Sequence, residues 1–268
     1  MEEGNKTLAV RKSRVLDKLR RGEVACSIKI NVSGPEACEI ATLAGFDCVW
    51  TCMEHVPQTY ADVRGQAMVC KAHDVDLMVR IPRGSYSDYI RPFEMDATGI
   101  MVPHILSAQD ARDVVQKTRF YPEGRRPLDG GNADGRYCML PMADYLRDSN
   151  REKMVVLQIE DPEPMAELEA ICDMPGYDVL FFGPGDFSHA TGHALDLFHP
   201  DVVAARKRIA KTARKYGKAL GTVCVGDTRE LLDEGYRLLN VGSDVAALSQ
   251  YYKRQHADFA ALLQECGL

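Results

Sequence analysis

Four side chains that could do chemistry stand at or just after the ends of short apolar runs: His55, Arg80, Glu160 and Asp186. If these runs are strands of a parallel barrel, their carboxyl ends meet at one rim and bring the four side chains together. One histidine, one arginine and two carboxylates at one rim could bind a cation, hold an anionic substrate and move a proton.

Glu160 and Asp186 are the candidate metal ligands. Two neighbouring carboxylates repel each other unless a positive charge lies between them. Oxygen ligands with open positions suit Mg2+, Mn2+ or a similar hard cation, with water or substrate completing an octahedron. Each acid follows an apolar run, whereas an ordinary acid stands on a solvated surface. The sequence therefore predicts a divalent-metal site, and the alternative is that both acids are solvated.

His55 and Arg80 are candidates for proton transfer and anion binding. His55 could be a general base or a metal ligand, although a lone histidine is more often structural. Arg80 is the next-to-last residue of the apolar run 77–81, where an unpaired guanidinium is costly to bury. An anionic substrate or a carboxylate partner would explain it, and the alternative is an arginine extending from the barrel mouth to a surface acid. The turn 183–186 places backbone N–H groups near Asp186, where they could hold a carboxylate.

Three further histidines invite a zinc interpretation, which we do not favour. His189 and His193 have i, i+4 spacing, and His199 follows them. Thr191-Gly192 argues against a helix between the first two, and no acid stands in the arrangement that zinc proteases require. His104, after the fourth apolar run, is expected to be structural or exposed, with lining the site as the alternative.

The elements that must position these residues alternate along the chain, because each apolar run of strand type is followed by a segment of helical period. The predicted strands are 25–32, 48–53, 77–81, 99–102, 154–159, 178–182, 219–224 and 237–241. The predicted helices are 35–44, 60–72, 87–95, 108–117, 163–172, 201–216, 228–234 and 245–264.

Eight strand–helix units predict an α/β fold, a (β/α)8 TIM barrel, with an open doubly wound sheet as the runner-up. An extra helix is expected at 11–21, ahead of the first strand. Segment 119–151, rich in Gly, Pro, Asp and Arg, is expected to be a long irregular insertion that forms a lid or an interface. We see no linker, so residues 1–268 are expected to form a single barrel domain.

Composition excludes several function classes. The chain has 33 Lys and Arg against 39 Asp and Glu, a net charge of −6, so no basic nucleic-acid footprint is expected. No apolar run reaches the length of a membrane span, and the polar start resembles no secretory signal. Nine scattered cysteines without CxxC pairs fit a reducing compartment, so we expect a cytoplasmic protein.

Six motifs occur in a fixed order along the chain. They are the segment 35–47, Met53-Glu54-His55, Val79-Arg80-Ile81-Pro82, Gly99-Ile100-Met101-Val102-Pro103, Gln158-Ile159-Glu160 and Gly183-Pro184-Gly185-Asp186-Phe187-Ser188. In order and spacing they resemble the HpcH/HpaI family of class II, metal-dependent pyruvate aldolases. The resemblance covers roughly residues 34–248.

This resemblance implies a function and a place for each residue. A divalent cation (Mg2+, Mn2+ or Co2+) would be held by Glu160 and Asp186 and chelated by the pyruvate unit of a small 2-keto acid substrate. Arg80 would steady the keto or enolate oxygen, and His55 would be the acid–base group. Gln158 would lie close to the pyruvate, and backbone N–H groups of Gly185 and Asp186 would bind its carboxylate. The substrate would be a 4-hydroxy-2-keto acid, cleaved to pyruvate and an aldehyde.

The resemblance also implies an assembly. The last helix would pack on a neighbouring subunit in a homo-oligomer, commonly a hexamer built as a trimer of dimers. The segment 246–263 agrees, because it is apolar at helical spacing with charges between.

Several positions depart from the family pattern, including Asp96 where Gly is usual and Arg126-Pro127 where Gly is common after Arg. Cys52 stands where members usually carry Asp, three residues before the histidine, and Glu94 stands where Asp is usual. We therefore expect His55 to be a weaker base, or to be oriented by another group such as Glu94 or a water. Two alternatives stay open: oxaloacetate-type decarboxylation, which needs no strong base at His55, and a catalytically weak relative that only binds a keto acid.

Overall fold

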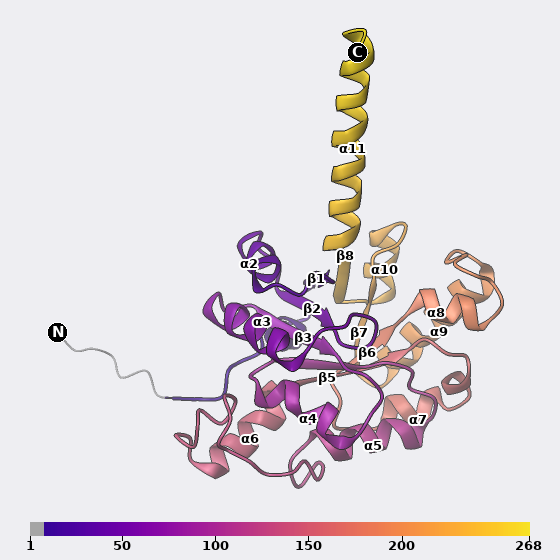
Figure 1. Ribbon diagram of the computed structural model, residues 1–268. Coiled ribbons are helices and arrows are strands. Elements are labelled where there is room, and N and C mark those ends of the chain that lie inside the picture. The colour runs from indigo at the N-terminus through magenta and orange to yellow at the C-terminus, as the bar shows by residue number, and fades with distance from the viewer. Residues whose placement is uncertain (1–7) are drawn as a thin grey trace.

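Eight parallel strands close a barrel in chain order, each paired with the next and β8 with β1, in a computed structural model that describes residues 8–268 (Figure 1). The (β/α)8 prediction is therefore confirmed. The strands are β1 (Ala25–Ile30), β2 (Cys48–Cys52), β3 (Asp76–Arg80), β4 (Gly99–Val102), β5 (Met154–Ile159), β6 (Val179–Phe182), β7 (Ala219–Val223) and β8 (Leu238–Ser243).

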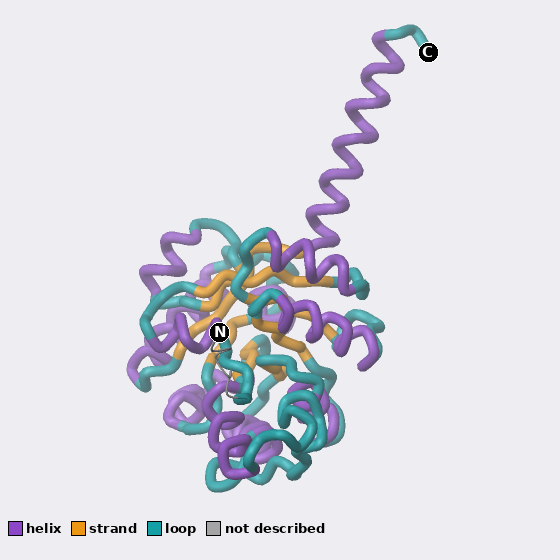
Figure 2. Tube along the Cα trace, turned by 90° about the vertical axis from the view of Figure 1, so that its left-hand side faces the viewer, coloured by secondary structure: helices purple, strands orange, loops and turns teal. Residues whose placement is uncertain are grey.

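Most of the helices flank the barrel, and the last one projects away from it, as Figures 1 and 2 show from two sides. They are α1 (Arg14–Arg20), α2 (Pro35–Leu43), α3 (Tyr60–Ala72), α4 (Tyr86–Glu94), α5 (Ala108–Thr118), α6 (Met142–Glu152), α7 (Leu168–Asp173), α8 (Pro184–Ala190), α9 (Pro200–Lys215), α10 (Thr228–Glu234) and α11 (Asp244–Glu265). Within residues 8–268, no helix combines the length and the apolarity that crossing a bilayer requires.

Alternation along each strand decides which side chains enter the barrel. Trp50, Met78, Met101 and Phe181 belong to one buried cluster inside it. The apolar strand side chains of the opposite phase face outward and pack under the helices in a second, larger cluster. Near the carboxyl ends, the same alternation turns the chemically active side chains inward, above this apolar layer.

α1 closes the amino end of the barrel. Val15 and Leu16 belong to the interior cluster, so the helix is a plug rather than an appendage. The carboxylate of Asp76, at the start of β3, holds the plug by accepting hydrogen bonds from Ser13 Oγ at 2.6 Å and from the Val15 N–H at 2.9 Å. The extra N-terminal helix is therefore confirmed, and it closes the amino end of the barrel.

The insertion 119–151 differs from its prediction. It contains most of α6, whose polar, Asp- and Arg-rich sequence hid the helix, and it has a buried network of its own. Asp134 accepts hydrogen bonds from Arg126 Nη2 and from the Tyr145 hydroxyl, both at 2.8 Å. Because this segment leads from α5 into the amino end of β5, it lies at the end of the barrel opposite the strand-end residues. The prediction of a lid over the strand-end residues of the same chain is therefore wrong, and the alternative of an interface stays a prediction.

Two other elements differ from the sequence prediction. The expected helix 163–172 is broken into a 3-10 turn, Glu163–Ala166, and α7. α8 was expected to be only a turn, yet it forms because Pro184 at its first position suits the start of a helix and needs no N–H partner. α8 matters for the site because Asp186 lies in its first turn.

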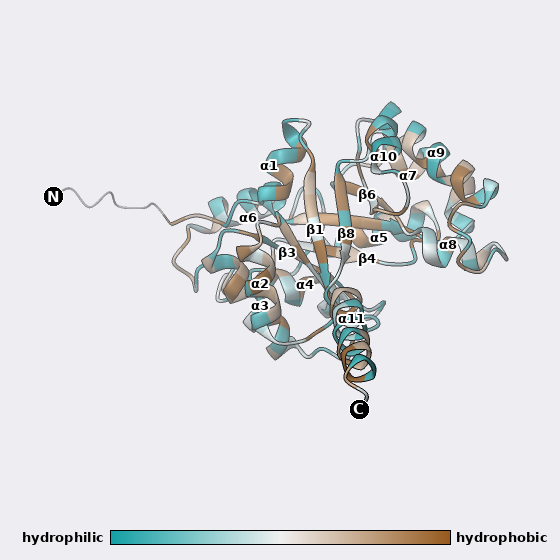
Figure 3. Ribbon diagram, turned by 90° about the horizontal axis from the view of Figure 1, so that it is seen from above, coloured by the Kyte–Doolittle hydropathy of each residue, from teal (hydrophilic) through white to brown (hydrophobic). Residues whose placement is uncertain are grey.

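α11 projects from the barrel as a single helix of 22 residues with no buried side chain (Figures 1 and 2). Hydrophobic and hydrophilic residues are mixed along it, as the view from above shows (Figure 3). Tyr251, Tyr252 and Phe259 are between 58% and 63% exposed. A helix of this kind has apolar surface that no other residue of the range 8–268 buries.

Candidate active site at the carboxyl end of the barrel

Glu160, directly after β5, is a buried carboxylate whose negative charge is only partly balanced by its neighbours. Its side chain is 1% exposed. Oε1 accepts a hydrogen bond from the His104 N–H at 3.0 Å, and Oε2 accepts one from Gln158 Nε2. Burial raises the pKa of Glu160 to about 7, the charges of His104 and Arg80 lower it, and the charge of Asp186 raises it further. A bound cation would supply the missing positive charge.

Asp186 and two glycines complete this side of the mouth. Asp186 is exposed in the first turn of α8, and its charge contributes to the raised pKa of Glu160. A Cβ on Gly183 would come within 2.8 Å of both Gln158 Nε2 and Glu160 Oε2, so glycine is what leaves room for this pair. A Cβ on Gly185 would meet nothing within 4 Å, so the space beside it is open.

Arg80 ends β3 with a buried, partnered guanidinium that is 4% exposed. Its Nε lies 3.0 Å from Glu54 Oε2 and donates to Cys52 Sγ at 3.3 Å, and its Cζ lies 5.3 Å from the centre of the Trp50 ring. Burial and pairing decide against the alternative of an arginine that reaches out to the surface.

His104 is better oriented than its sequence context predicts. Its backbone has a left-handed φ of 51°, which is uncommon for residues other than glycine, and its N–H donates to Glu160. Nδ1 lies 2.8 Å from Asp161 Oδ2, while Nε2 lies 3.6 Å from Glu54 Oε1 and 3.7 Å from Glu160 Oε1. Burial lowers the pKa of His104, but the Asp161 hydrogen bond and the surrounding carboxylates raise it on balance.

Glu54, His104 and Glu160 offer ligand atoms that all lie within 4.8 Å of one another. Sequence reasoning missed Glu54 as a member of the site and expected His104 to be structural or exposed. The signal for Glu54 was present, because it stands between two residues of a motif directly after β2. His104 gave no comparable signal, since its orientation depends on Asp161 of another strand end.

His55 is exposed and makes few contacts with its neighbours. Its side chain is 55% exposed, and Nε2 lies 3.5 Å from Glu54 Oε2. The fully buried Cys52 thiol accepts the His55 backbone N–H at 3.4 Å rather than a ring nitrogen. Glu94 does not join His55 within this chain, because it ends α4 beside the amino end of β4, where its carbonyl accepts the Ala133 N–H.

Lys29, on β1, is a site residue that sequence reasoning did not find. It pairs in register with Trp50, and its Nζ lies 5.4 Å from the centre of that ring. The signal was the period-two alternation of β1, which turns Ala25, Ser27 and Lys29 to the same face. The apolar residues around Lys29 obscured this alternation.

The histidines of the zinc interpretation lie outside the mouth. His193 Nε2 lies 3.1 Å from Asp201 Oδ2, and the rings of His193 and His199 stack with their centres 3.4 Å apart. His199 is the N-cap of α9 and accepts the Asp201 N–H on Nδ1. His193, His199 and Asp201 offer ligand atoms that lie within 4.8 Å of one another, His199 also caps α9, and His189 is not part of this group.

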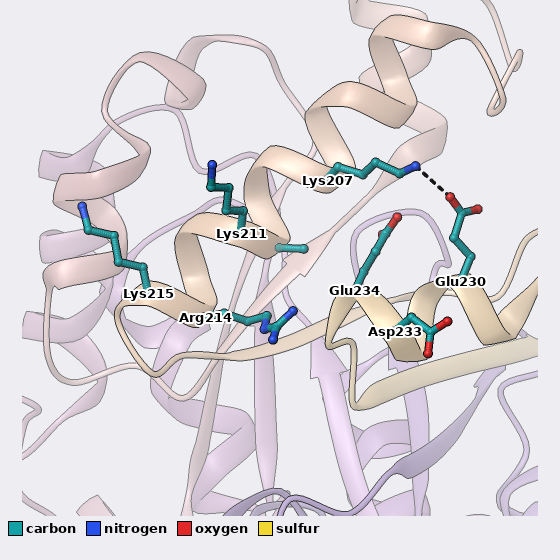
Figure 4. Close-up of a pocket in the computed structure, with 8 residues that line it drawn as sticks. Lys207, Lys211, Arg214, Lys215, Glu230, Asp233 and Glu234 are labelled. Carbon is teal, nitrogen blue, oxygen red and sulfur yellow. Dashed lines mark ion pairs between the residues drawn. The ribbon is translucent and has the colours of Figure 1, made fainter.

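A depression of about 610 Å³ on the outside of the molecule, between α9 and α10, is not the site (Figure 4). One ion pair of its lining joins the two helices, with Lys207 Nζ 2.9 Å from Glu230 Oε1. None of the strand-end side chains lines it. The residues with uncompensated charge lie at the barrel mouth instead.

Comparison with known proteins agrees with this geometry. The sequence profile of the HpcH/HpaI aldolase/citrate lyase family matches residues 30–250. A hydroxypyruvate/pyruvate aldolase of Delftia acidovorans is 31% identical over 235 residues, 87% of each chain. A 5-keto-4-deoxy-D-glucarate aldolase of Klebsiella pneumoniae is 31% identical over 216 residues, 80% of this chain and 84% of the relative. The crystal structure of a Burkholderia cenocepacia protein of the HpcH/HpaI aldolase/citrate lyase family superposes with a TM-score of 0.85 at 30% identity, covering 93% of this chain and all of that one.

Proposed function

Because the chain belongs to the HpcH/HpaI aldolase/citrate lyase family and is an aldolase of the class II type, we propose that it cleaves a 4-hydroxy-2-keto acid to pyruvate and an aldehyde. The observation that carries the proposal is the buried Glu160 carboxylate, near Asp186, Arg80 and His104. The named relatives are aldolases, which favours cleavage over the decarboxylase and binding-only alternatives.

A divalent cation fits the residues at the mouth, and we assign it to Glu160 and Asp186. Burial without full compensation raises the pKa of Glu160 to about 7, which is the expected state of a metal-binding carboxylate considered without its metal. Carboxylate oxygens favour a hard cation, so Mg2+, Mn2+ and Co2+ are the candidates. When bound, such a cation polarises the keto group and stabilises the enolate.

Arg80 is the group we expect to hold the keto oxygen. Its Nε is engaged by Glu54 and Cys52, which fixes the guanidinium plane. Among residues 8–268, its terminal nitrogens have no hydrogen-bond partner and remain for a ligand. Donors fixed in advance on a developing oxyanion cost no reorganisation during the reaction.

Gln158 and the start of α8 are expected to orient the keto acid. Gln158 donates to Glu160, and its own Oε1 is buried and lacks a partner among the described residues. A buried acceptor in this state supports a ligand group beside it. The N–H groups of Gly185 and Asp186 are expected to bind the substrate carboxylate, and the open space beside Gly185 leaves room for it.

His55 is expected to take the proton of the 4-hydroxyl group. Its exposure lets it exchange protons with solvent, and its contact with Glu54 is the only orienting interaction that its ring makes within the described chain. General-base catalysis needs the ring within hydrogen-bond reach of the hydroxyl. We therefore expect the substrate to place its 4-hydroxyl group beside His55 at the barrel mouth.

We also infer that α11 packs on a second copy of the chain, in a hexamer or another dimer-based assembly. None of its 22 residues is buried, and large apolar side chains such as Phe259 are exposed. Light scattering at micromolar concentration should give an oligomer, and Phe259→Glu should weaken it. A monomer for the unaltered chain would contradict this assignment.

The activity itself is tested by pyruvate release from a panel of 4-hydroxy-2-keto acids. We expect release with Mn2+, none with EDTA, and recovery when Mn2+ is returned in excess. Oxaloacetate serves as a parallel substrate that reports decarboxylation. Faster pyruvate formation from oxaloacetate than from every hydroxy-keto acid would move the assignment to decarboxylation, and no release from any substrate would refute the proposal.

A further inference from the structure

The loop 191–199 joins α8 to α9 at the outer edge of the molecule (Figure 1). It brings together His193, within the loop, His199, at its end, and Asp201, in the first turn of α9. We call these three residues the α8–α9 triad. Capping of α9 uses one nitrogen of His199 and explains neither the position of His193 nor that of the Asp201 carboxylate. The proposed aldol reaction gives the triad no role.

Both imidazoles of the α8–α9 triad face the same oxygen. His193 Nε2 lies 3.1 Å and His199 Nδ1 lies 3.7 Å from Asp201 Oδ2, and the two rings stack with 15° between their planes. Two protonated imidazoles at this spacing would repel each other, and one carboxylate can balance only one of their charges. A single dication removes this conflict, because imidazoles bind a metal in their neutral form.

The Asp201 carboxylate is not occupied by a lysine or an arginine. Among residues 8–268, the basic nitrogens within 4.0 Å of it belong to the two histidines alone. Glu230, an exposed acid on α10, differs in this respect, because it pairs with Lys207 at 2.9 Å and with Arg206 at 3.0 Å on α9. Asp201 is therefore available as a metal ligand.

The backbone of the loop fixes both histidines in place. The His193 N–H donates to the Ser188 carbonyl at 2.7 Å, and the His193 carbonyl accepts the Asp196 N–H at 2.8 Å. The Asp196 carbonyl in turn accepts the His199 N–H at 3.1 Å. Binding therefore needs no ordering of the loop, only rotation of each ring about its Cβ–Cγ bond, a torsion with broad minima.

The donor set of the triad differs from that of the barrel mouth. Two imidazole nitrogens and one carboxylate oxygen suit Zn2+, with water in the fourth tetrahedral position, whereas carboxylate oxygens alone suit Mg2+ or Mn2+. The i, i+4 pair of His189 and His193 is a different arrangement, because His189 is exposed on α8 and contributes no ligand atom to the triad.

We propose that His193, His199 and Asp201 bind a Zn2+ ion that fastens the loop 191–199 to the beginning of α9. The ion joins residues from both sides of the loop, so it holds the chain that leaves α8 against α9. The site is independent of the proposed aldol reaction, because it shares no residue with the cation site assigned to Glu160 and Asp186.

Calorimetric titration with Zn2+ tests the site. The full-length Glu160→Gln variant separates it from the barrel mouth, and we expect one equivalent bound with a Kd on the order of 10 μM or below, in an excess of Mg2+. Adding His193→Gln or Asp201→Asn should weaken this binding at least about tenfold, the smallest usual cost of losing even an outer-shell partner. His199→Asn should do the same while keeping the cap, because asparagine caps helices well. His189→Gln is the matched control and should stay within about twofold.

Two further measurements place the ion and control for folding. Zn2+ should slow amide hydrogen exchange in residues 191–199, which distinguishes the triad from the exposed thiols of Cys138 and Cys266. It should also raise the melting temperature of the His189→Gln protein but not that of the His193→Gln protein. Melting without metal shows which variants fold, and each folded triad variant decides the question by itself.

Unchanged Zn2+ affinity in a folded His193→Gln or His199→Asn variant would overturn the proposal. So would slowed exchange that appears only outside the loop, or an equal loss of affinity in His189→Gln. If the barrel mouth holds no metal, the unaltered protein and Glu160→Gln give the same titration, and only the proposed reaction is affected. Zn2+ binding that the triad variants remove supports the loop site in either case.

Discussion

The two ends of the barrel differ in how their buried charges are balanced. At the amino end, buried charges are matched by the chain itself. Asp76 accepts hydrogen bonds from the N-terminal plug, which offset part of the rise in its pKa that burial causes, and Asp96 lies within 3.0 Å of Lys71, Lys153 and Arg136. These cations hold the pKa of Asp96 far below its usual range despite burial. Such a carboxylate is stable as an anion and needs no ligand.

At the carboxyl end, the described chain does not fully balance its buried charges. Glu160 is as buried as Asp96, yet its pKa is raised to about 7, and Lys29 has no partner within the described chain. His55 is exposed with one long contact. Because the chain can satisfy buried charges where it needs stability, the unsatisfied ones mark where ligands bind.

The largest expected effect comes from removing the incompletely compensated carboxylates. Glu160→Gln or Asp186→Asn should lower kcat/KM for aldol cleavage by at least about a thousandfold, because the cation that stabilises the enolate is lost. Calorimetry with Mn2+ should find no tight site, and circular dichroism should find the fold intact. Metal affinity like that of the unaltered protein in either variant would contradict the assignment.

A smaller loss is expected at Arg80. Arg80→Met removes donors on the keto oxygen and should lower kcat by about a hundredfold to a thousandfold, with KM changed much less. Arg83 is the matched control, because it lies three residues further on and pairs with Asp110 at 2.6 Å. Arg83→Met should leave kcat within about twofold. Similar losses in the two variants would point to a general effect of charge.

Cys52 gives a third, more modest test. Cys52→Asp should raise cleavage of a generic 4-hydroxy-2-keto acid by about tenfold and shift the pH–rate profile, since a carboxylate near His55 favours its protonated form. Cys52→Ser, which adds no charge, should do neither. Slower cleavage by Cys52→Asp would identify the thiol as a tuned part of the site, and kcat/KM measured against pH decides between these outcomes.

The smallest effect on turnover is expected at the amino end, where the change should appear in stability. Asp96→Asn should leave kcat/KM within about twofold but lower the free energy of unfolding at pH 7 by about 3 kcal/mol, because Lys153 loses its buried partner. The folded-state pKa of Asp96 is depressed, so its contribution is fully present above the unfolded-state pKa of ~4 and is lost as the pH falls below that value and through the folded-state pKa. The difference between the variant and the unaltered protein should therefore shrink in acid, as urea unfolding at several pH values can measure.

Much of the fold could be read from the sequence because apolar strands with few charges repeat eight times, and that rhythm does not depend on tertiary contacts. The helices within irregular stretches could not be predicted from the sequence. α6 is rich in Asp and Arg, and its core contact is made by Tyr145 inside a network that only the folded insertion assembles.

The site was predictable in part, and the division has a physical reason. Glu160 and Arg80 stand out because a charge at the end of an apolar strand is costly to bury unless it binds a ligand or a partner. Lys29 and His104 depend on which way a strand turns its side chains and on a partner from another strand. Glu94 follows the family spacing, but α4 runs back along the barrel and leaves it at the amino end, away from His55.

Glu160 and Asp186, in our proposal, hold the cation that lets this aldolase form the enolate of pyruvate. Exchange of the pyruvate methyl protons with D2O, followed by NMR, measures enolate formation without knowledge of the aldehyde. We predict rapid exchange with Mg2+ or Mn2+, loss of exchange with EDTA, and no exchange in Glu160→Gln at any metal concentration. Exchange that persists in EDTA, or at an unaltered rate in Glu160→Gln, would contradict the proposal.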